Sequence, residues 1–426
     1  MTEPLDMMHI FRSQPRPVAD LALRLIARVP RRLFRTTVAG ELDAATKRRL
    51  ESSQAHWVQM PLPTGVEPLR QLETARRLAR LLENQGTRVV HAHGFQAAFT
   101  ALSARRQVSA HPPVICTPYG PPHLGARTGL RRHSVAAAAS WVLQHADVVT
   151  VQSEAELQQM EELTTRGLTN VVVLPEGVDL EPLRADFEAG AKRRMVGLDA
   201  GAAIVGVMAA PEGRGIDDFL QAAHRVSLAM PNVEFVLLGH GAKTEEFAQK
   251  AHELGLAGAT VFLGDRADII EIIASLNLLV IPAEYIGARR HALHALANNI
   301  PLVVTTDGGL PEVVTDVQLA KAVPMGDTTA LERIITALLD TVPGAAGTDM
   351  IVEELGINYS EMLIPEVVLD LDRPGLQLIS DRELSEQERD VLRTIERFSM
   401  TKIASRFTEL YLQVANDRGS SQQGDV

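Results

Sequence analysis

The sequence predicts an α/β protein built from two doubly wound parallel-sheet domains. Short runs of Val, Ile and Leu recur along the chain, and each run ends in Gly, Ser, Asp or Pro or in a short polar turn. Longer segments with the spacing of an amphipathic helix lie between these runs. Continuous apolar strands that alternate with helices are typical of a parallel sheet covered by helices on both faces.

In the first half of the chain, predicted strands alternate with predicted helices. Four runs are predicted as strands: RVVHAHG (88–94), PVICTPYG (113–120), ADVVTVQS (146–153) and NVVVLPEGVD (170–179). Helices are predicted for EPLRQLETARRLARLLENQG (67–86) and HSVAAAASWVLQHA (133–146). This set forms a first domain over residues 1–182.

The pattern then starts again, which predicts a second domain over residues 183–397. Its strand candidates are AAIVGVMAAP (202–211), NVEFVLLGHG (232–241), ATVFLGD (259–265), LNLLVIPAE (276–284) and IPLVVTTDGG (300–309). Ligands of open parallel sheets bind at the carboxyl ends of the strands. We therefore expect the two domains to face each other across a ligand-binding cleft.

Composition restricts the class of protein. The chain has 426 residues, of which 46% are hydrophobic and 22% charged, as in a globular protein. No apolar run is long enough to span a membrane, and the N-terminus lacks the apolar core of a signal peptide. Cys116 is the single cysteine, which excludes an internal disulfide and favours a cytoplasmic location.

Charge is distributed unevenly along the chain, although the net charge is −11. Residues 1–175 hold 21 basic and 14 acidic side chains, which leaves 21 basic and 39 acidic side chains for the rest. We do not expect nucleic acid as a partner, because aromatic residues are only 4% of the chain and are not interleaved with the basic ones. A membrane surface, or an anionic acceptor held on one, is the expected partner of the basic half.

Residues 11–35 carry seven of these arginines and one aspartate. An amphipathic helix is predicted there, with one apolar face made of Leu21, Leu25, Ile26 and Val29. Such a helix either rests on the inner face of an anionic membrane or packs as an ordinary core helix.

Several ordered segments together resemble the family-four glycosyltransferases, retaining enzymes that use nucleotide sugars and have the GT-B fold. The segments are VVHAHGFQAAFTALSARR (89–106), ADVVTVQSEAE (146–156), VVVLPEGVDLEPL (171–183), PEGRGIDDFLQAAHRVSLAMPNVEFVLLGHG (211–241) and TTDGGLPEVV (305–314). The resemblance covers roughly residues 86–340. It implies a C-terminal helix (398–416) that crosses back to the first domain, followed by a disordered tail (417–426).

The resemblance also implies a donor site, in which several family residues are replaced. Arg214 stands where the family has a phosphate-binding Lys. Ile286 and His294 occupy the places of the two family glutamates, and Glu284 lies two residues before the first of them. Gly287 precedes a helix whose first turn includes Arg289, and a helix N-terminus favours anions.

Two further segments complete the implied site. Gly308, Gly309 and Glu312 belong to the donor-binding set through the segment TTDGGLPEVV. In the first domain, Tyr119 stands where the family has a His beside the reacting sugar. Tyr119, Ile286 and His294 thus fill family positions without supplying the family's side chains, so no catalytic residue is assigned.

The resemblance predicts transfer of a hexosyl unit from a nucleotide sugar to a polysaccharide or a lipid-linked acceptor. The diphosphate would be held without a metal ion or a cofactor other than the donor itself. The alternative is a non-catalytic GT-B subunit that binds a partner enzyme or a glycan, with the insertion at residues 341–390 as a protein contact. A GT-B sugar-nucleotide epimerase is a third hypothesis, which the loss of carboxylates disfavours.

Overall fold

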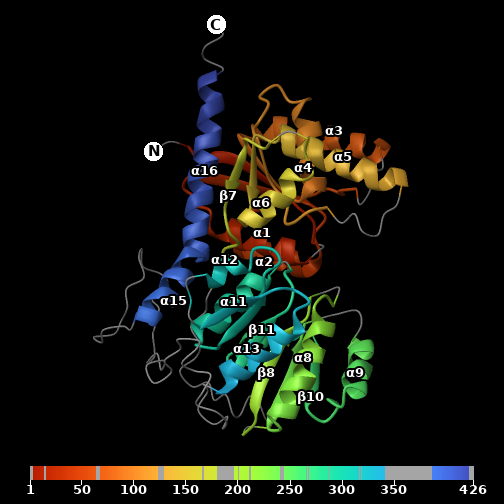
Figure 1. The fold of residues 1–426 in the computed structure, drawn as a ribbon. Coiled ribbons are helices and arrows are strands. Elements are labelled where there is room, and N and C mark those ends of the chain that lie inside the picture. The colour runs from red at the N-terminus through yellow and green to blue at the C-terminus, as the bar shows by residue number, and fades with distance from the viewer. Residues whose placement is uncertain are drawn as a thin grey trace, which may run out of the picture. The chain divides into compact units, whose positions relative to one another are not determined.

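The computed structural model divides into two compact units. Unit 1 comprises Met1–Gly177 and Phe398–Val426, and unit 2 comprises Val178–Arg397. Each unit is described by itself (Figure 1). The structure describes residues 3–13, 16–63, 68–122, 129–165, 167–179, 196–199, 201–210, 213–239, 244–264, 266, 268–285, 287–315, 317, 319–340 and 386–421.

Unit 1 contains a seven-stranded parallel sheet with the order β3-β2-β1-β4-β5-β6-β7. Its strands are β1 (Leu5–Ile10), β2 (Phe34–Gly40), β3 (His56–Gln59), β4 (Val89–His93), β5 (Val114–Thr117), β6 (Val148–Val151) and β7 (Val171–Val173). The sequence analysis did not predict β1, β2 and β3. Strands β2 and β3 lie toward one edge of the sheet and mix polar with apolar residues, so they lack the continuous apolar run of a central strand.

Helices cover both faces of this sheet. They are α1 (Arg16–Arg28), α2 (Ala44–Ser52), α3 (Pro68–Gln85), α4 (Phe95–Arg105), α5 (Gly129–His145), α6 (Glu154–Glu161) and α16 (Met400–Ser421). One core cluster joins α3, α4 and α5 to one face of the sheet. On the opposite face, side chains of α1 and α16 pack on Met7, Val89 and Ile115.

The apolar face of α1 belongs to this core. Leu21, Leu25, Ile26 and Val29 are all buried. These four apolar side chains therefore pack inside unit 1 and do not form an exposed apolar face. The core-helix alternative is correct, since burial of these side chains stabilises the unit.

Unit 2 contains a six-stranded parallel sheet with the order β10-β9-β8-β11-β12-β13. Its strands are β8 (Ala203–Met208), β9 (Val233–Leu238), β10 (Thr260–Gly264), β11 (Leu278–Ile281), β12 (Leu302–Thr305) and β13 (Ala320–Val323). Its helices are α8 (Ile216–Ala229), α9 (Thr244–Glu253), α10 (Ile269–Ile273), α11 (Ala288–Ala297), α12 (Pro311–Val314), α13 (Thr328–Asp340) and α15 (Glu386–Arg397). The two sheets confirm the predicted α/β fold class.

The last helical segment differs from its prediction. A C-terminal helix was expected over residues 398–416; in the structure α15 ends at Arg397 and α16 begins at Met400. The Ser399 hydroxyl accepts a hydrogen bond from the Lys402 backbone N–H at 3.3 Å, so Ser399 caps a new helix. Helix α16 then continues to Ser421, into the segment that was predicted to be a disordered tail. Most of the 341–390 insertion, residues 341–385, lies outside the described residues.

Candidate functional site

The order of the strands marks one position in unit 2 where a ligand is expected. Strands β8 and β11 are neighbours in the sheet but not in the sequence, so the connections on their two sides run in opposite directions. At such a switch point, the loops leave a crevice at the carboxyl ends of the strands. The loop after β8 carries Arg214, and the loop after β11 carries Glu284 and Gly287.

Arg214 lies beside the loop that follows β11. Its Nη2 donates a hydrogen bond to the Glu284 carbonyl oxygen at 2.6 Å, and its Nη1 lies 3.8 Å from Asp307 Oδ2. The Arg214 side chain remains 51% exposed. Gly215 follows in the left-handed region with φ 76°, and a Cβ there would overlap the Pro282 carbonyl, so only glycine permits this close approach.

Glu284 is turned toward the glycine turn that follows β12. Its carboxylate accepts a hydrogen bond from the Gly309 backbone N–H. Gly308 has φ 71°, and a Cβ at that position would overlap the Glu284 carboxylate. Asp307 adjoins this turn, and its Oδ2 lies 3.4 Å from the Glu284 backbone N–H.

Helix α11 begins at the same end of the sheet. Gly287 is its N-cap residue in the left-handed region, with φ 96° and no side chain to cap the first turn. Arg289 is buried, and its Nη2 lies 3.4 Å from the Gly309 carbonyl oxygen. His291 Nδ1 is 2.8 Å from the Tyr285 hydroxyl.

The structure thus brings some of the predicted donor-binding residues together. Hydrogen bonds or ion pairs join Arg214 and Arg289 to the Glu284–Gly309 region, and the Glu312 backbone N–H donates to the Gly309 carbonyl at 3.2 Å. His294 is a buried residue of α11. Ile286 lies outside the described residues. The sequence analysis did not single out Asp307, because an Asp before two glycines is also a common turn residue.

In unit 1, the turn that contains Tyr119 is held by a buried glutamate. Glu156 accepts hydrogen bonds from the backbone N–H groups of Gly120 and Gln152, each at 2.6 Å. Its own N–H donates to the Ser153 hydroxyl at 3.0 Å, so Ser153 is the N-cap of α6. Tyr119 has φ 58°, an uncommon value for a residue with a side chain.

The Tyr119 side chain joins a buried polar network. Its hydroxyl lies 2.8 Å from His93 Nδ1, and His93 Nε2 lies 2.9 Å from His9 Nδ1. His91 contacts the hydroxyls of Tyr411 and Thr117, each at 2.7 Å. His9 lies opposite His91 in the register of β1 and β4.

Burial sets the protonation of this network. It lowers the pKa of His9 to about 3 and lowers the pKa values of His91 and His93 well below their usual range. It also raises the pKa of the Tyr119 hydroxyl, with further contributions from Glu176 and Glu156. The three imidazoles and the phenol are therefore neutral near pH 7, since burial disfavours the charged forms.

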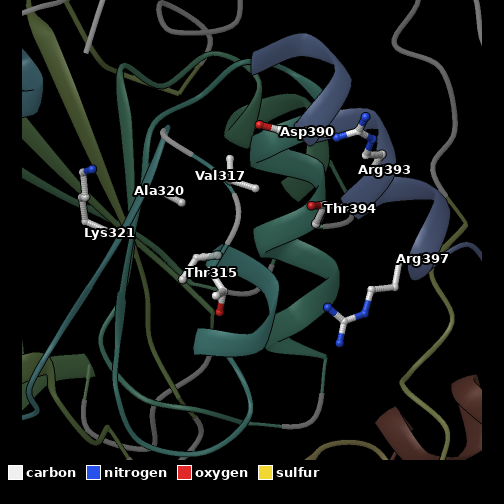
Figure 2. Close-up of a pocket in the computed structure, with 9 residues that line it drawn as sticks. Thr315, Val317, Ala320, Lys321, Asp390, Arg393, Thr394 and Arg397 are labelled. Atoms are coloured by element: carbon white, nitrogen blue, oxygen red, sulfur yellow. Dashed lines mark hydrogen bonds and ion pairs between the residues drawn. The ribbon is translucent and has the colours of Figure 1, made fainter. Parts of the chain in front are cut away.

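A pocket of about 650 Å³ lies elsewhere in unit 2 (Figure 2). Its lining comes from the segment between α12 and β13 and from α15, and it includes Lys321, Asp390, Arg393 and Arg397. Because Ala320 is the first residue of β13, this pocket lies at the amino edge of the sheet. It is thus separate from the carboxyl edge, where Arg214 and Glu284 meet.

Among the described residues, no helix is both long and apolar enough to cross a bilayer.

Two family models match the chain. The model described as glycosyl transferases group 1 matches residues 201–341, and the model described as glycosyl transferase 4-like domain matches residues 18–177.

Two named relatives share about a quarter of the aligned residues with this chain. The chain is 26% identical over 263 residues to glycogen synthase of Mycobacterium tuberculosis, which is 61% of this chain and 61% of that relative. It is 25% identical over 185 residues to the lipopolysaccharide core mannosyltransferase LpsB of Rhizobium meliloti, covering 42% of this chain and 52% of that relative. Both alignments thus span less than two thirds of the relative's length.

Solved structures match over nearly the whole chain. Anabaena HepE in complex with UDP and glucose has a TM-score of 0.70 at 17% identity, covering 96% of this chain and 100% of that one. A glycosyltransferase from Rickettsia africae has a TM-score of 0.72 at 13% identity, covering 97% and 99%. At such low identity, these likenesses establish the fold alone.

Proposed function

This chain belongs to the group 1, family-four-like glycosyltransferases with the GT-B fold, and from that premise we propose that it transfers a hexosyl unit from a nucleotide sugar to a polysaccharide or lipid-linked acceptor. The donor would bind at the carboxyl edge of the unit 2 sheet, at the switch point between β8 and β11. Nucleotides bind at such points in doubly wound sheets.

The position of Arg214 carries this proposal. It is a half-exposed guanidinium held at the switch point by the Glu284 carbonyl, beside the turn that contains Gly309. A guanidinium can bind a diphosphate with two parallel hydrogen bonds. In sugar transfer, such a group would stabilise the charge that develops on the leaving nucleotide diphosphate.

The sugar-binding groups of this proposal differ from the family pattern. Glu284 is the carboxylate nearest to the place of the first family glutamate, and it is directed at Gly309. In unit 1, the Tyr119 hydroxyl contacts His93, and burial raises its pKa above the usual range, so it would not serve as a base.

One observation favours the non-catalytic alternative. The groups that would receive the donor's anionic oxygens already face carboxylates: Gly309 N–H bonds Glu284, and Arg214 lies 3.8 Å from Asp307. The carboxylates of Asp307 and Glu284 thus place negative charge on groups that would otherwise face the diphosphate. Under this alternative, the chain serves as a subunit that binds a partner enzyme or a glycan.

Nucleotide titration tests the donor site. Calorimetric titration of the full chain with UDP, GDP, ADP and their hexose conjugates should show that one of these nucleotides binds at a single site. UDP is tested first, because the HepE structure contains UDP. Arg214→Ala should weaken that binding about 10- to 100-fold, the range for losing hydrogen bonds to a charged group. Arg266→Ala is the matched control, since Arg266 is a partly exposed arginine of unit 2 that pairs with Asp268.

Turnover then separates the two candidate functions. Release of nucleotide diphosphate from the bound sugar nucleotide, stimulated by glycan or lipid-linked acceptors, supports the transferase. Binding without any release supports the non-catalytic subunit. Absence of binding by every nucleotide, in a folded protein, rules out the donor site itself.

A further inference from the structure

Three buried histidines meet at the switch point of the unit 1 sheet. Strands β1 and β4 are neighbours in that sheet although β2 and β3 separate them in the sequence. His9 comes from β1, and His91 and His93 come from β4, near the carboxyl ends of both strands. This is the position where doubly wound sheets bind ligands.

The imidazole nitrogens are close enough to share one ion. Each histidine offers one ring nitrogen within 4.8 Å of the nitrogens offered by the other two. The shortest approach is the 2.9 Å between His9 Nδ1 and His93 Nε2. Two nitrogens on a tetrahedral zinc with Zn–N bonds of about 2.0–2.1 Å are separated by about 3.3 Å, so a small shift of two rings would admit the ion.

The surrounding residues resemble an outer shell for metal ligands. His93 Nδ1 contacts the Tyr119 hydroxyl, and His91 Nδ1 contacts the Tyr411 hydroxyl. Metal-bound histidines usually donate their second N–H to such a group, which fixes the ring. His91 Nε2 can be released for an ion, because its partner Thr117 also bonds the Thr150 hydroxyl at 2.5 Å.

The local charge also suits a cation. Neutral imidazole is the form that binds metals. Glu156 is a buried carboxylate that accepts a hydrogen bond from the Gly120 backbone N–H, next to Tyr119. That charge would offset part of the cost of burying a dication.

We propose that His9, His91 and His93 form a binding site for a divalent transition metal ion, with zinc as the preferred ion. Imidazole ligands suit zinc, and three of them leave a fourth tetrahedral position for an exogenous oxygen. This site belongs to unit 1 and is independent of the donor site in unit 2, so either can fail without the other.

Metal content and titration test the site. The full chain, expressed with zinc in the medium and then purified, should contain about one zinc ion per chain. Inductively coupled plasma mass spectrometry measures this metal content. After removal by a chelator, zinc chloride should rebind with micromolar affinity or better, measured by competition with a chromophoric chelator. His9→Gln and His93→Gln should each weaken binding at least about 100-fold, because each removes a ligand.

His56→Gln is the matched control, since His56 is an exposed histidine of the same unit and should bind like the unaltered chain. Tyr119→Phe keeps the ligands but removes an outer hydroxyl, and it should weaken binding about 10- to 100-fold. Equal binding by His9→Gln and the unaltered chain, or no zinc in the unaltered chain, would overturn the proposal.

Spectroscopy of the unaltered chain gives an answer even if the ligand variants fail to fold. X-ray absorption of the zinc-loaded protein should show three imidazole nitrogens at about 2.0–2.1 Å. A first shell of oxygen or sulfur, or fewer than three imidazoles, would contradict the assignment.

Discussion

The carboxylate of Glu284 accepts a hydrogen bond from the backbone N–H of Gly309. This contact joins the loop after β11 to the turn after β12, at the edge of the sheet where the donor is proposed to bind. It also depends on Gly308, whose missing Cβ leaves the space that the carboxylate fills. The competition between this internal carboxylate and a ligand's anionic oxygens can be measured.

We expect Gly308→Ala to destabilise unit 2 by about 1–3 kcal/mol, because alanine at φ 71° is strained and its Cβ overlaps Glu284. Urea unfolding, followed by circular dichroism, measures the change. In a Glu284→Ala background, the same substitution should cost less, since the overlap with the carboxylate is gone and only the strain of the backbone remains. Equal costs in both backgrounds would show that the two residues are not coupled.

Asp307→Asn should strengthen nucleotide binding. The substitution removes a negative charge 3.8 Å from Arg214, which frees the guanidinium for the diphosphate. Because the pair is partly exposed, the gain should be about 0.2–1 kcal/mol, or up to about fivefold in Kd. Calorimetric titration measures it, with Asp268→Asn as the control. A weaker complex would mean that Asp307 itself contacts the ligand.

Glu156→Gln should destabilise unit 1 by about 2–4 kcal/mol. Its buried carboxylate accepts from two backbone N–H groups, and an amide can replace only one of its two acceptor oxygens. Chemical unfolding of the full chain measures the loss. Glu161→Gln, an exposed residue of the same helix, should change stability by less than about 0.5 kcal/mol. A similar result for both variants would remove the structural role given to Glu156.

Cys116 should be unreactive in the folded protein. It is fully buried in β5, and burial raises the pKa of its thiol, so the reactive thiolate is scarce. Labelling by iodoacetamide, followed by mass spectrometry, should be at least about 1000-fold slower than in urea, because the thiol reacts only through unfolding. Because the chain has one cysteine, a single modified mass reports the result. Rapid labelling without denaturant would indicate local opening of the unit 1 sheet.

Periodicity determined most of the fold. The nine predicted strand segments coincide with β4 to β12, because each contains a short apolar run; this holds for the edge strands β7 and β10 as well as for the central strands. Strands β1, β2, β3 and β13 escaped prediction. Strands β2, β3 and β13 lie at or beside a sheet edge and are short or partly polar, and β1 carries Asp6 and His9 among its apolar residues. The separate start of α16 depends on one serine, Ser399, which a periodic pattern does not reveal.

For the candidate site, the sequence by itself determined which residue types follow the strands, including Arg214 after β8 and the glycine pair after β12. Only the tertiary structure decided which groups these residues contact. It turned Glu284 toward Gly309, buried the apolar face of α1, and set His9 opposite His91. The physical reason is the distance along the sequence over which interactions act, since strand and helix patterns depend on residues that are neighbours in the sequence. The direction of a side chain across a parallel sheet instead depends on a register fixed by residues far away in the chain.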